Sequence, residues 1–191
     1  TPGCRRGKGA FKDTRPEDLL SFILKSAVEK TTNLDFDKVD DLMIGCSFPE
    51  AEQGLNIGRI AGQIAGFPES VSGATVNRFC SSGSQTIAMA ADTIRSGNAD
   101  IVVAGGVESM SMVAMGGNKP IAYPGLMYDM PNAYAAMGTT AEVVARRFDI
   151  TREMQDEYAA NSQNMAAAAW EACWAVPMAG GTCADHSKSP G

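Results

Sequence analysis

The segment 74–106 constrains the fold more than any other part of this sequence. Residues 74–79 (Ala-Thr-Val-Asn-Arg-Phe) are predicted as a strand, and residues 81–96 then carry small and apolar side chains at helical spacing. Gly97 follows as a helix stop. Residues 100–105 are an almost uninterrupted apolar run, typical of a strand buried on both faces of a sheet. A strand, a helix and a strand within about 30 residues predict a βαβ unit and an α/β fold.

Shorter patterns predict the other elements. Residues 16–30 place apolar side chains on one helical face, and Pro16 suits the first turn of a helix. Thr14 and Glu17 have the spacing of a capping box at the start of that helix. The remaining predicted elements are a short buried strand at 41–45, helices at 55–65, 139–148 and 152–171 with Thr151 as the N-cap of the last, a long loop at 111–131 and an irregular tail at 173–191.

The charge and the cysteines exclude several classes of function. Lys and Arg number 16 against 22 for Asp and Glu, a net charge of −6 without a basic block, so neither nucleic acid nor an anionic membrane surface is an expected partner. No apolar run reaches the roughly 20 residues that span a bilayer, and the first residues lack the apolar region of a secretory signal. Five widely spaced cysteines and one histidine provide neither a disulfide framework nor a zinc site. We expect a reducing, cytoplasmic setting and no bound metal.

Cys80 is the candidate nucleophile, because it lies where the predicted strand 74–79 passes into the predicted helix 81–96. A thiol at a helix N-terminus meets the positive end of the helix dipole and unpaired backbone N–H groups. Both stabilise the thiolate, the form that attacks carbonyls. Residues 81–84 are small and leave room for a bulky substrate, and the same N–H groups could accept an oxyanion as it forms.

Other interpretations compete with this one. A cysteine beside an apolar strand is most often a small buried hydrophobe, and we assign that role to Cys46, at the end of the strand 41–45. His186 could act as a general base toward Cys80, but its Gly- and Ser-rich surroundings do nothing to hold it in place. Gly105-Gly106 with Glu108 is a further candidate, for a phosphate-binding turn. We interpret Asp40 and Asp41 as solvated turn residues. We assign no catalytic role to Cys4, Cys173 and Cys183, which lie in irregular segments.

Several segments together resemble the thiolase family. Residues 77–83 (Asn-Arg-Phe-Cys-Ser-Ser-Gly) resemble its nucleophile motif, and residues 105–111 (Gly-Gly-Val-Glu-Ser-Met-Ser) resemble its second N-terminal signature. Residues 137–142 and 150–156 are similar to the helical part of the thiolase loop domain, and residues 1–19 are similar to the family's opening. The similarity extends in the family's order to residue 172.

The resemblance implies a particular architecture. Thiolases have a layered α/β/α/β/α fold of two similar halves, and this chain would supply the N-terminal half, with a βαβ-based mixed sheet. Residues 1–110 would form the α/β domain, residues 111–172 part of the helical loop domain inserted in it, and residues 173–191 a tail that does not resemble the family.

The resemblance also implies an activity, the reversible thiolytic cleavage of a 3-ketoacyl-CoA in fatty acid β-oxidation. Cys80 would form the acyl-enzyme, acetyl-CoA would leave, and a second CoA would collect the shortened acyl group. CoA is then a substrate, and no metal or redox cofactor is needed. We assign Met137 to substrate binding, since methionine suits walls that accept varied acyl chains. Thiolases form dimers, so we expect a homo-oligomer.

The 191 residues depart from the family in one respect that matters for catalysis. They contain no Gly-His-Pro segment, no Asn-Glu motif for the oxyanion site and no Cys-x-Gly segment, and the strand that normally precedes Thr1 is missing. We therefore expect this truncated chain to be inactive alone. Two alternatives remain: a β-ketoacyl condensing enzyme acting on acyl carrier protein, which shares Cys-Ser-Ser-Gly, and a non-enzymatic fragment that associates with full-length subunits.

Overall fold

The computed structural model describes residue 9 and residues 11–171. The described residues form two compact units, one up to residue 120 and one from residue 121 onward.

The first unit is built on a parallel sheet of three strands, β1 (Asp41–Gly45), β2 (Ser72–Val76) and β3 (Val102–Gly106), in the order β2-β1-β3. The α/β class predicted from the sequence is confirmed, but the three strands described form a purely parallel sheet and not the mixed sheet expected. Gly45 is in register with Val76 on one side and with Gly106 on the other. The three strands therefore end at the same level, and the segments that leave them share one edge of the sheet.

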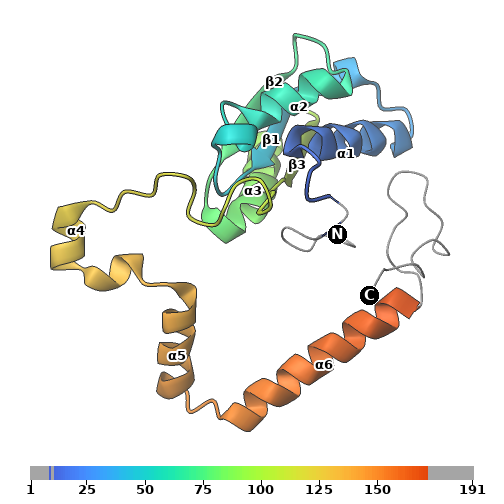
Figure 1. The fold of residues 1–191 in the computed structure, drawn as a ribbon. Coiled ribbons are helices and arrows are strands. Elements are labelled where there is room, and N and C mark those ends of the chain that lie inside the picture. Colours follow the sequence, from blue (N-terminus) through green and yellow to red (C-terminus); the bar gives the residue numbers. More distant parts are fainter. Residues whose placement is uncertain (1–8, 10, 172–191) are drawn as a thin grey trace. The chain divides into compact units, whose positions relative to one another are not determined.

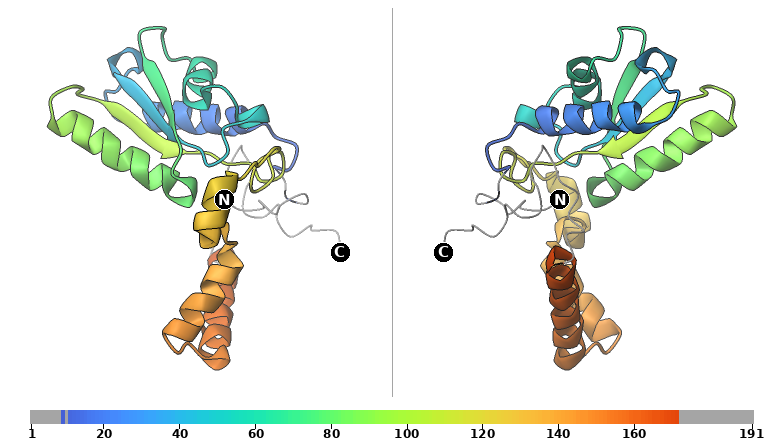
Figure 2. Two further views of the ribbon diagram at one scale, coloured as in Figure 1. Left: turned by 90° about the vertical axis from the view of Figure 1, so that its left-hand side faces the viewer. Right: turned by 90° about the vertical axis from the view of Figure 1, so that its right-hand side faces the viewer.

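Helices cover both faces of this sheet (Figures 1 and 2). Helix α1 (Pro16–Lys30) packs against α2 (Ile57–Ala65), which lies on β1 and β2, while α3 (Ser82–Arg95) packs against β1 and β3 from the other face. The core lies between α1, α2 and the sheet, and includes Leu20, Leu24, Val28, Leu42, Ile44, Ile57 and Ala61. Each large side chain buried in this way contributes about 1.5–3 kcal/mol of hydrophobic stabilisation.

The start of α1 differs from the sequence prediction. The predicted capping box of Thr14 and Glu17 is wrong: Arg15 is the N-cap residue, and no side chain caps the helix. Arg15 instead forms an ion pair with Glu17, which keeps the Glu17 carboxylate from reaching back to the helix start. Pro16 does occupy the first turn, as predicted.

The start of α2 is decided by Asn56 rather than by apolar spacing. The Asn56 side-chain oxygen accepts hydrogen bonds from the Arg59 N–H (3.3 Å) and the Thr75 hydroxyl (2.8 Å), and its amide donates to the Gly73 carbonyl (2.7 Å). One side chain thus caps the helix and ties it to β2. Leu55, predicted to begin the helix, is outside it and 92% exposed.

The strands that flank Cys80 also differ in extent from the prediction. Strand β2 ends at Val76, three residues before the predicted end at Phe79. Strand β3 is only partly buried, so the prediction of burial on both faces is wrong. β3 lies at the edge of the described sheet and pairs only with β1. One side of the strand therefore has no neighbouring strand, which leaves it more exposed.

Asp40 and Asp41 are structural rather than simply solvated. The Asp40 carboxylate accepts hydrogen bonds from the backbone N–H groups of Ile101 (2.9 Å) and Asp100 (2.8 Å), which lower the pKa of this carboxyl. The Asp41 carboxylate accepts from the Ser72 hydroxyl (2.8 Å). The two carboxylates therefore tie the start of β1 to the segment before β3 and to β2.

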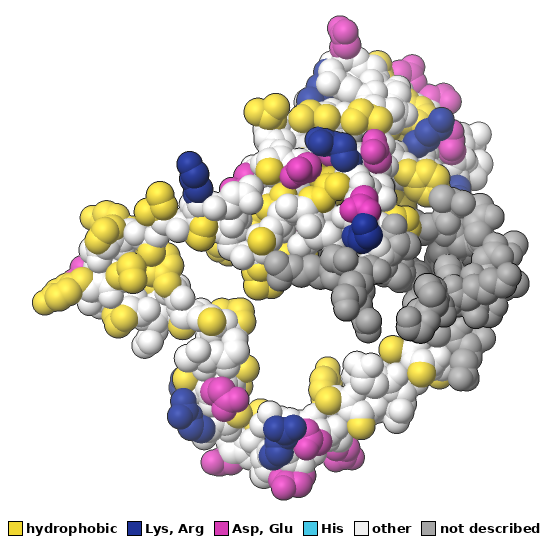
Figure 3. Space-filling model, viewed as in Figure 1, with side chains coloured by type: hydrophobic (Ala, Val, Ile, Leu, Met, Phe, Trp, Pro, Cys, Tyr) yellow, Lys and Arg dark blue, Asp and Glu magenta, His cyan; other side chains and the backbone are white. Residues whose placement is uncertain are grey.

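The second unit consists of short and long helices: α4 (Pro124–Asp129), the 3₁₀ turn η4 (Pro131–Tyr134), α5 (Met137–Arg147) and α6 (Arg152–Glu171). The predicted loop at 111–131 therefore contains a helix, which begins with Pro124 in its first turn. Thr151 caps α6 as predicted, because its hydroxyl accepts the Met154 N–H (3.3 Å). No residue from 121 to 168 is buried, and Figure 3 shows many hydrophobic side chains at the surface of this unit. None of the described helices has the length and apolar character needed to cross a membrane.

Gly45 permits the closest approach between the sheet and α3. A Cβ added at Gly45 would lie 2.6 Å from the Gly83 nitrogen and 2.7 Å from the Ser82 carbonyl oxygen. Both are backbone atoms of the first helical turn, which cannot rotate away as a flexible side chain would. The absence of a side chain at Gly45 therefore sets how deeply the N-terminus of α3 rests on the end of β1.

We expect Gly45→Ala to lower the free energy of unfolding by about 1–3 kcal/mol, the usual cost of overpacking. Urea unfolding followed by circular dichroism measures the effect. Gly105→Ala is the matched control, because a Cβ at Gly105, also within a strand, meets no heavy atom within 4 Å. Equal destabilisation by both substitutions would contradict the close-approach argument.

Candidate active site at the carboxyl edge of the sheet

Cys80 lies between a strand and a helix, where the sequence predicted it. It is the middle residue of the 3₁₀ turn η3 (Phe79–Ser81), which follows β2 and leads directly into α3. The Cys80 side chain is exposed. Its position at the start of the 14-residue helix α3 provides the positive end of a helix dipole.

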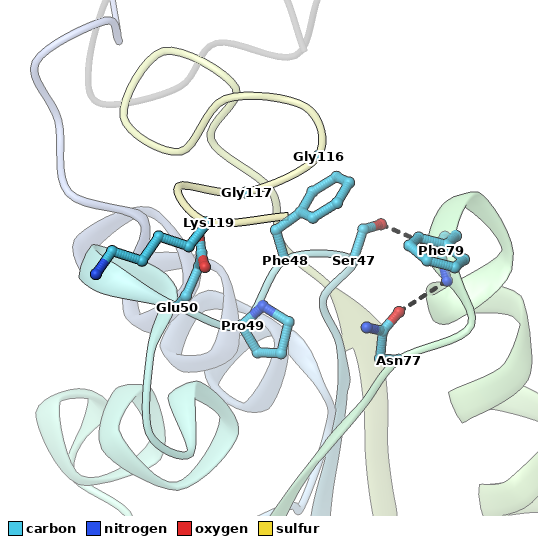
Figure 4. Close-up of a pocket in the computed structure, with 9 residues that line it drawn as sticks. All are labelled: Ser47, Phe48, Pro49, Glu50, Asn77, Phe79, Gly116, Gly117 and Lys119. Atoms are coloured by element: carbon cyan, nitrogen blue, oxygen red, sulfur yellow. Dashed lines mark hydrogen bonds between the residues drawn. The ribbon is translucent and has the colours of Figure 1, made fainter. Parts of the chain in front are cut away.

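The residue before Cys80 has an unusual backbone conformation. Phe79 has φ of +45°, in the left-handed region that costs a residue other than glycine about 1–3 kcal/mol. Its N–H donates to the Asn77 side-chain oxygen (2.9 Å), and its carbonyl accepts from the hydroxyls of Ser82 (2.6 Å) and Ser47 (2.8 Å). Figure 4 shows Asn77 and Ser47 directed at Phe79 from two different segments. Side chains on both sides thus offset the cost of this conformation.

A buried polar network joins the ends of β1 and β3. The Glu108 carboxylate accepts hydrogen bonds from the Ser47 N–H (2.7 Å) and from the Gln53 amide (2.6 Å). Gln53, which lies in the 3₁₀ turn η2 (Ala51–Gln53) and is fully buried, also donates to the Phe48 carbonyl (2.9 Å) and accepts from the Ser109 N–H. Glu108 therefore accepts hydrogen bonds from other segments of the protein itself. This does not support the phosphate-binding turn considered for Gly105, Gly106 and Glu108.

Cys46 contrasts with Cys80. It is 1% exposed, and burial together with the negative charge of Glu108 raises the pKa of the Cys46 thiol to about 12. The Cys46 sulfur lies 3.9 Å from a Glu108 carboxylate oxygen. Cys46 is thus a thiol in an apolar and negatively charged environment, in agreement with its prediction as a buried hydrophobe.

An open pocket of about 290 Å³ lies beside Phe79 (Figure 4). Its walls come from three segments, 47–50, 77–79 and 116–119, so the residues that follow β1 and β2 meet there with the segment beyond β3. Lys119 is the cation in its wall, and Glu50 the anion. The pocket shares Ser47, Asn77 and Phe79 with the turn that carries Cys80.

The structure locates the other predicted site residues as follows. Met137 is the first residue of α5, in the second unit, and its side chain is 71% exposed. His186, Cys4, Cys173 and Cys183 lie outside the described residues. Among the described side chains, no group of three His, Cys, Asp or Glu residues is placed to hold a metal ion.

Sequence reasoning missed Ser47 and Gln53 as members of the site. Ser47 is the second residue after β1, and Gln53 lies in the turn that follows. A signal was available for Ser47, because residues after parallel strands meet at one edge of the sheet. Gln53 gave no signal, since its buried position depends on how the 46–56 segment folds back on the sheet.

We expect Gln53→Leu to lower the free energy of unfolding by about 1–3 kcal/mol, because the Ser109 N–H and one Glu108 oxygen lose their partner in a buried site. Gln63→Leu is the control, since Gln63 lies on the exposed side of α2. Thermal unfolding measured for both variants distinguishes them. A Gln53→Leu protein as stable as the Gln63→Leu protein would show that the network is not stabilising.

We expect iodoacetamide to alkylate Cys80 much faster than Cys46 in the folded chain. A pKa of about 12 leaves roughly one Cys46 thiol in 10⁴ ionised at about pH 8, and Cys46 is buried as well. Peptide mapping by mass spectrometry measures both rates. In concentrated urea the two rates should become similar, and equal labelling of Cys46 without urea would contradict the prediction.

Comparison with known proteins identifies relatives of this chain. The family model described as the N-terminal domain of thiolase matches residues 1–178. A 3-ketoacyl-CoA thiolase of Bacillus subtilis (strain 168) is 44% identical over 169 residues, which are 88% of this chain and 43% of that protein. A 3-ketoacyl-CoA thiolase of Idiomarina loihiensis is 41% identical over 166 residues, which are 87% of this chain and 43% of that protein.

A solved structure is similar as well. The crystal structure of the Bacillus anthracis acetyl-CoA acetyltransferase matches with a TM-score of 0.72 and 34% identity, over 86% of this chain and 44% of that one. The chain thus spans less than half the length of these relatives. The thiolase-like fold expected from the sequence, for an N-terminal half, is confirmed. This chain belongs to the thiolase family.

Proposed function

We propose that this chain carries the acyl-accepting nucleophile of a thiolase-type acyltransferase, and that Cys80 is that nucleophile. The observation that supports the proposal best is the exposed position of Cys80 at the start of α3, on a turn fixed by Asn77, Ser47 and Ser82. The proposed substrate is a 3-ketoacyl-CoA, a class that the names of the B. subtilis and I. loihiensis relatives contain.

The chemistry proceeds in two transfers. The Cys80 thiolate attacks the 3-keto carbon, the bond between C2 and C3 breaks, and the electron pair goes to C2, which takes up a proton as acetyl-CoA leaves. The thiolate of a second CoA then attacks the thioester carbonyl and releases Cys80. No net oxidation or reduction occurs in either transfer, so our proposal includes no metal or redox cofactor, with CoA as a substrate. Cys80 lies exposed at the start of α3, next to the positive end of the helix dipole.

Further parts of the proposal extend beyond the site. We assign Met137 to the contact with the acyl chain. We place the activity in fatty acid β-oxidation, in a reducing, cytoplasmic setting, and expect a homodimer.

A condensing enzyme acting on acyl carrier protein is the competing activity. Acyl transfer to Cys80 from an acyl carrier protein, but not from CoA, would favour that alternative.

We also propose that these 191 residues alone do not turn over. They lack the Gly-His-Pro, Asn-Glu and Cys-x-Gly segments of the family. General-base activation contributes about 10²–10⁴ in rate, and an oxyanion donor about 10²–10³. The effects are not additive, because such residues act as a unit. The dipole of α3 would still allow slow, stoichiometric capture of an acyl group.

The test is to mix the chain with acetoacetyl-CoA and CoA, and to follow the ketothioester concentration together with the intact mass of the protein. We expect at most one acetyl adduct, mapped to Cys80, without multiple turnovers. Cys80→Ala should abolish the adduct, and Cys46→Ala, the matched control, should keep it. Multiple turnovers that vanish in Cys80→Ala would overturn the inactivity. An adduct that persists in Cys80→Ala would overturn the nucleophile.

A further inference from the structure

We propose that Asn77 and Ser82 are positioning residues, which hold Phe79 in its left-handed conformation and thereby place Cys80 at the start of α3. The inference rests on the proposed function, because only there does Cys80 act as a nucleophile. It adds two residues that have no role in the proposed transfers themselves.

The conformation of Phe79 has no support from its own side chain. The Phe79 side chain is 64% exposed, and its ring makes only a tilted contact with the ring of Phe48, at 6.0 Å between centroids. A residue other than glycine has better backbone conformations than φ of +45° and adopts them unless neighbouring groups prevent it. What holds Phe79 must therefore be the bonds to its backbone.

Ser82 spans the turn in both directions. Its hydroxyl donates to the Phe79 carbonyl (2.6 Å) and accepts from the Arg78 N–H (2.9 Å), and its own N–H also reaches the Phe79 carbonyl. The Ser82 side chain is buried, at 4% residue exposure, and it belongs to the first turn of α3. A buried hydroxyl with both a donor and an acceptor bond has little freedom to change partner.

Asn77 restrains the other side of the same residue. Its side-chain oxygen accepts the Phe79 N–H at 2.9 Å, in the pattern of an Asx turn, so both peptide groups of Phe79 are bonded to side chains. Ser47, in the segment after β1, donates a further hydrogen bond to the Phe79 carbonyl.

The peptide group between Phe79 and Cys80 is the link to function. Its carbonyl is the one that Ser82 and Ser47 bind, and its nitrogen belongs to Cys80. If Phe79 relaxed to a negative φ, this peptide group would turn, and Cys80 would leave the end of the helix dipole. The dipole acts only within the first turn of a helix, so a small displacement takes the Cys80 side chain out of its range.

The experiment measures the rate constant for alkylation of Cys80 by iodoacetamide in the 191-residue chain, between about pH 6 and pH 10, well below the thermal midpoint of each variant. We expect Ser82→Ala and Asn77→Ala to slow the reaction by about two- to fivefold near neutral pH, the effect of a helix dipole at an exposed position. Ser82→Thr keeps the hydroxyl and should recover the rate. Ser84→Ala, an exposed serine in the first turn of α3, is the matched control and should not change it.

A second pair of variants separates positioning from general stability. Glycine adopts positive φ without cost, whereas alanine does not. We therefore expect Phe79→Gly to restore the rate in the Ser82→Ala background, and Phe79→Ala to fail to do so, although both remove the same ring. A loss of rate that merely follows loss of stability would not distinguish these two double variants in this way.

Two results overturn the proposal: a normal alkylation rate in Ser82→Ala, or equal rates in the Phe79→Gly and Phe79→Ala double variants. The outcome for the proposed function is read separately, from the adduct with acetoacetyl-CoA. An adduct that forms equally fast in Ser82→Ala leaves Cys80 as the nucleophile and rejects the positioning role. If alkylation of Cys80 depends on Asn77 and Ser82 but no acetyl adduct forms with acetoacetyl-CoA, the positioning role is kept and the proposed function is rejected.

Discussion

The contact between the first turn of α3 and Gly45 is the constraint on which the site depends. Gly45 is the last residue of the central strand, and there is no room for a side chain between it and the backbone of Ser82 and Gly83. The parallel register places the ends of β2 and β3 level with Gly45. A helix seated at that depth brings its N-terminus, and with it Cys80, to the edge where all three strands end.

Polar groups, rather than apolar packing, organise that edge. Gln53 is fully buried and uses its amide and carbonyl groups to join the segments that follow β1 and β3, through Glu108, Phe48 and Ser109. A buried polar group is costly when unpaired, so a saturated network favours one arrangement of these segments over others. Burial raises the pKa of the Cys46 thiol, and the negative charge of Glu108 in this network raises it further. Two cysteines close to the carboxyl edge thus have opposite environments.

Much of the fold could be predicted from local patterns, and the exceptions share a cause. The bounds of α1, β1 and α6 agree with the predictions, because apolar spacing and Pro16 or Thr151 act within the element itself. The start of α2 was predicted two residues early, since Asn56 makes contacts to β2 that apolar spacing does not reveal. Asp40 was misinterpreted for the same reason, because its partners lie 60 residues away in the chain.

The sequence by itself determined the class of fold, the family and the position of Cys80 between a strand and a helix. These follow from periodicity and from short motifs, in which each residue is interpreted with its chain neighbours. Only the tertiary structure decided that Ser47 and Gln53 belong to the site, that Cys46 is shielded, and that Phe79 has a left-handed backbone. The physical reason is that hydrogen bonds and burial at the carboxyl edge join segments from three strands, and the spacing along any one segment holds no information about the others.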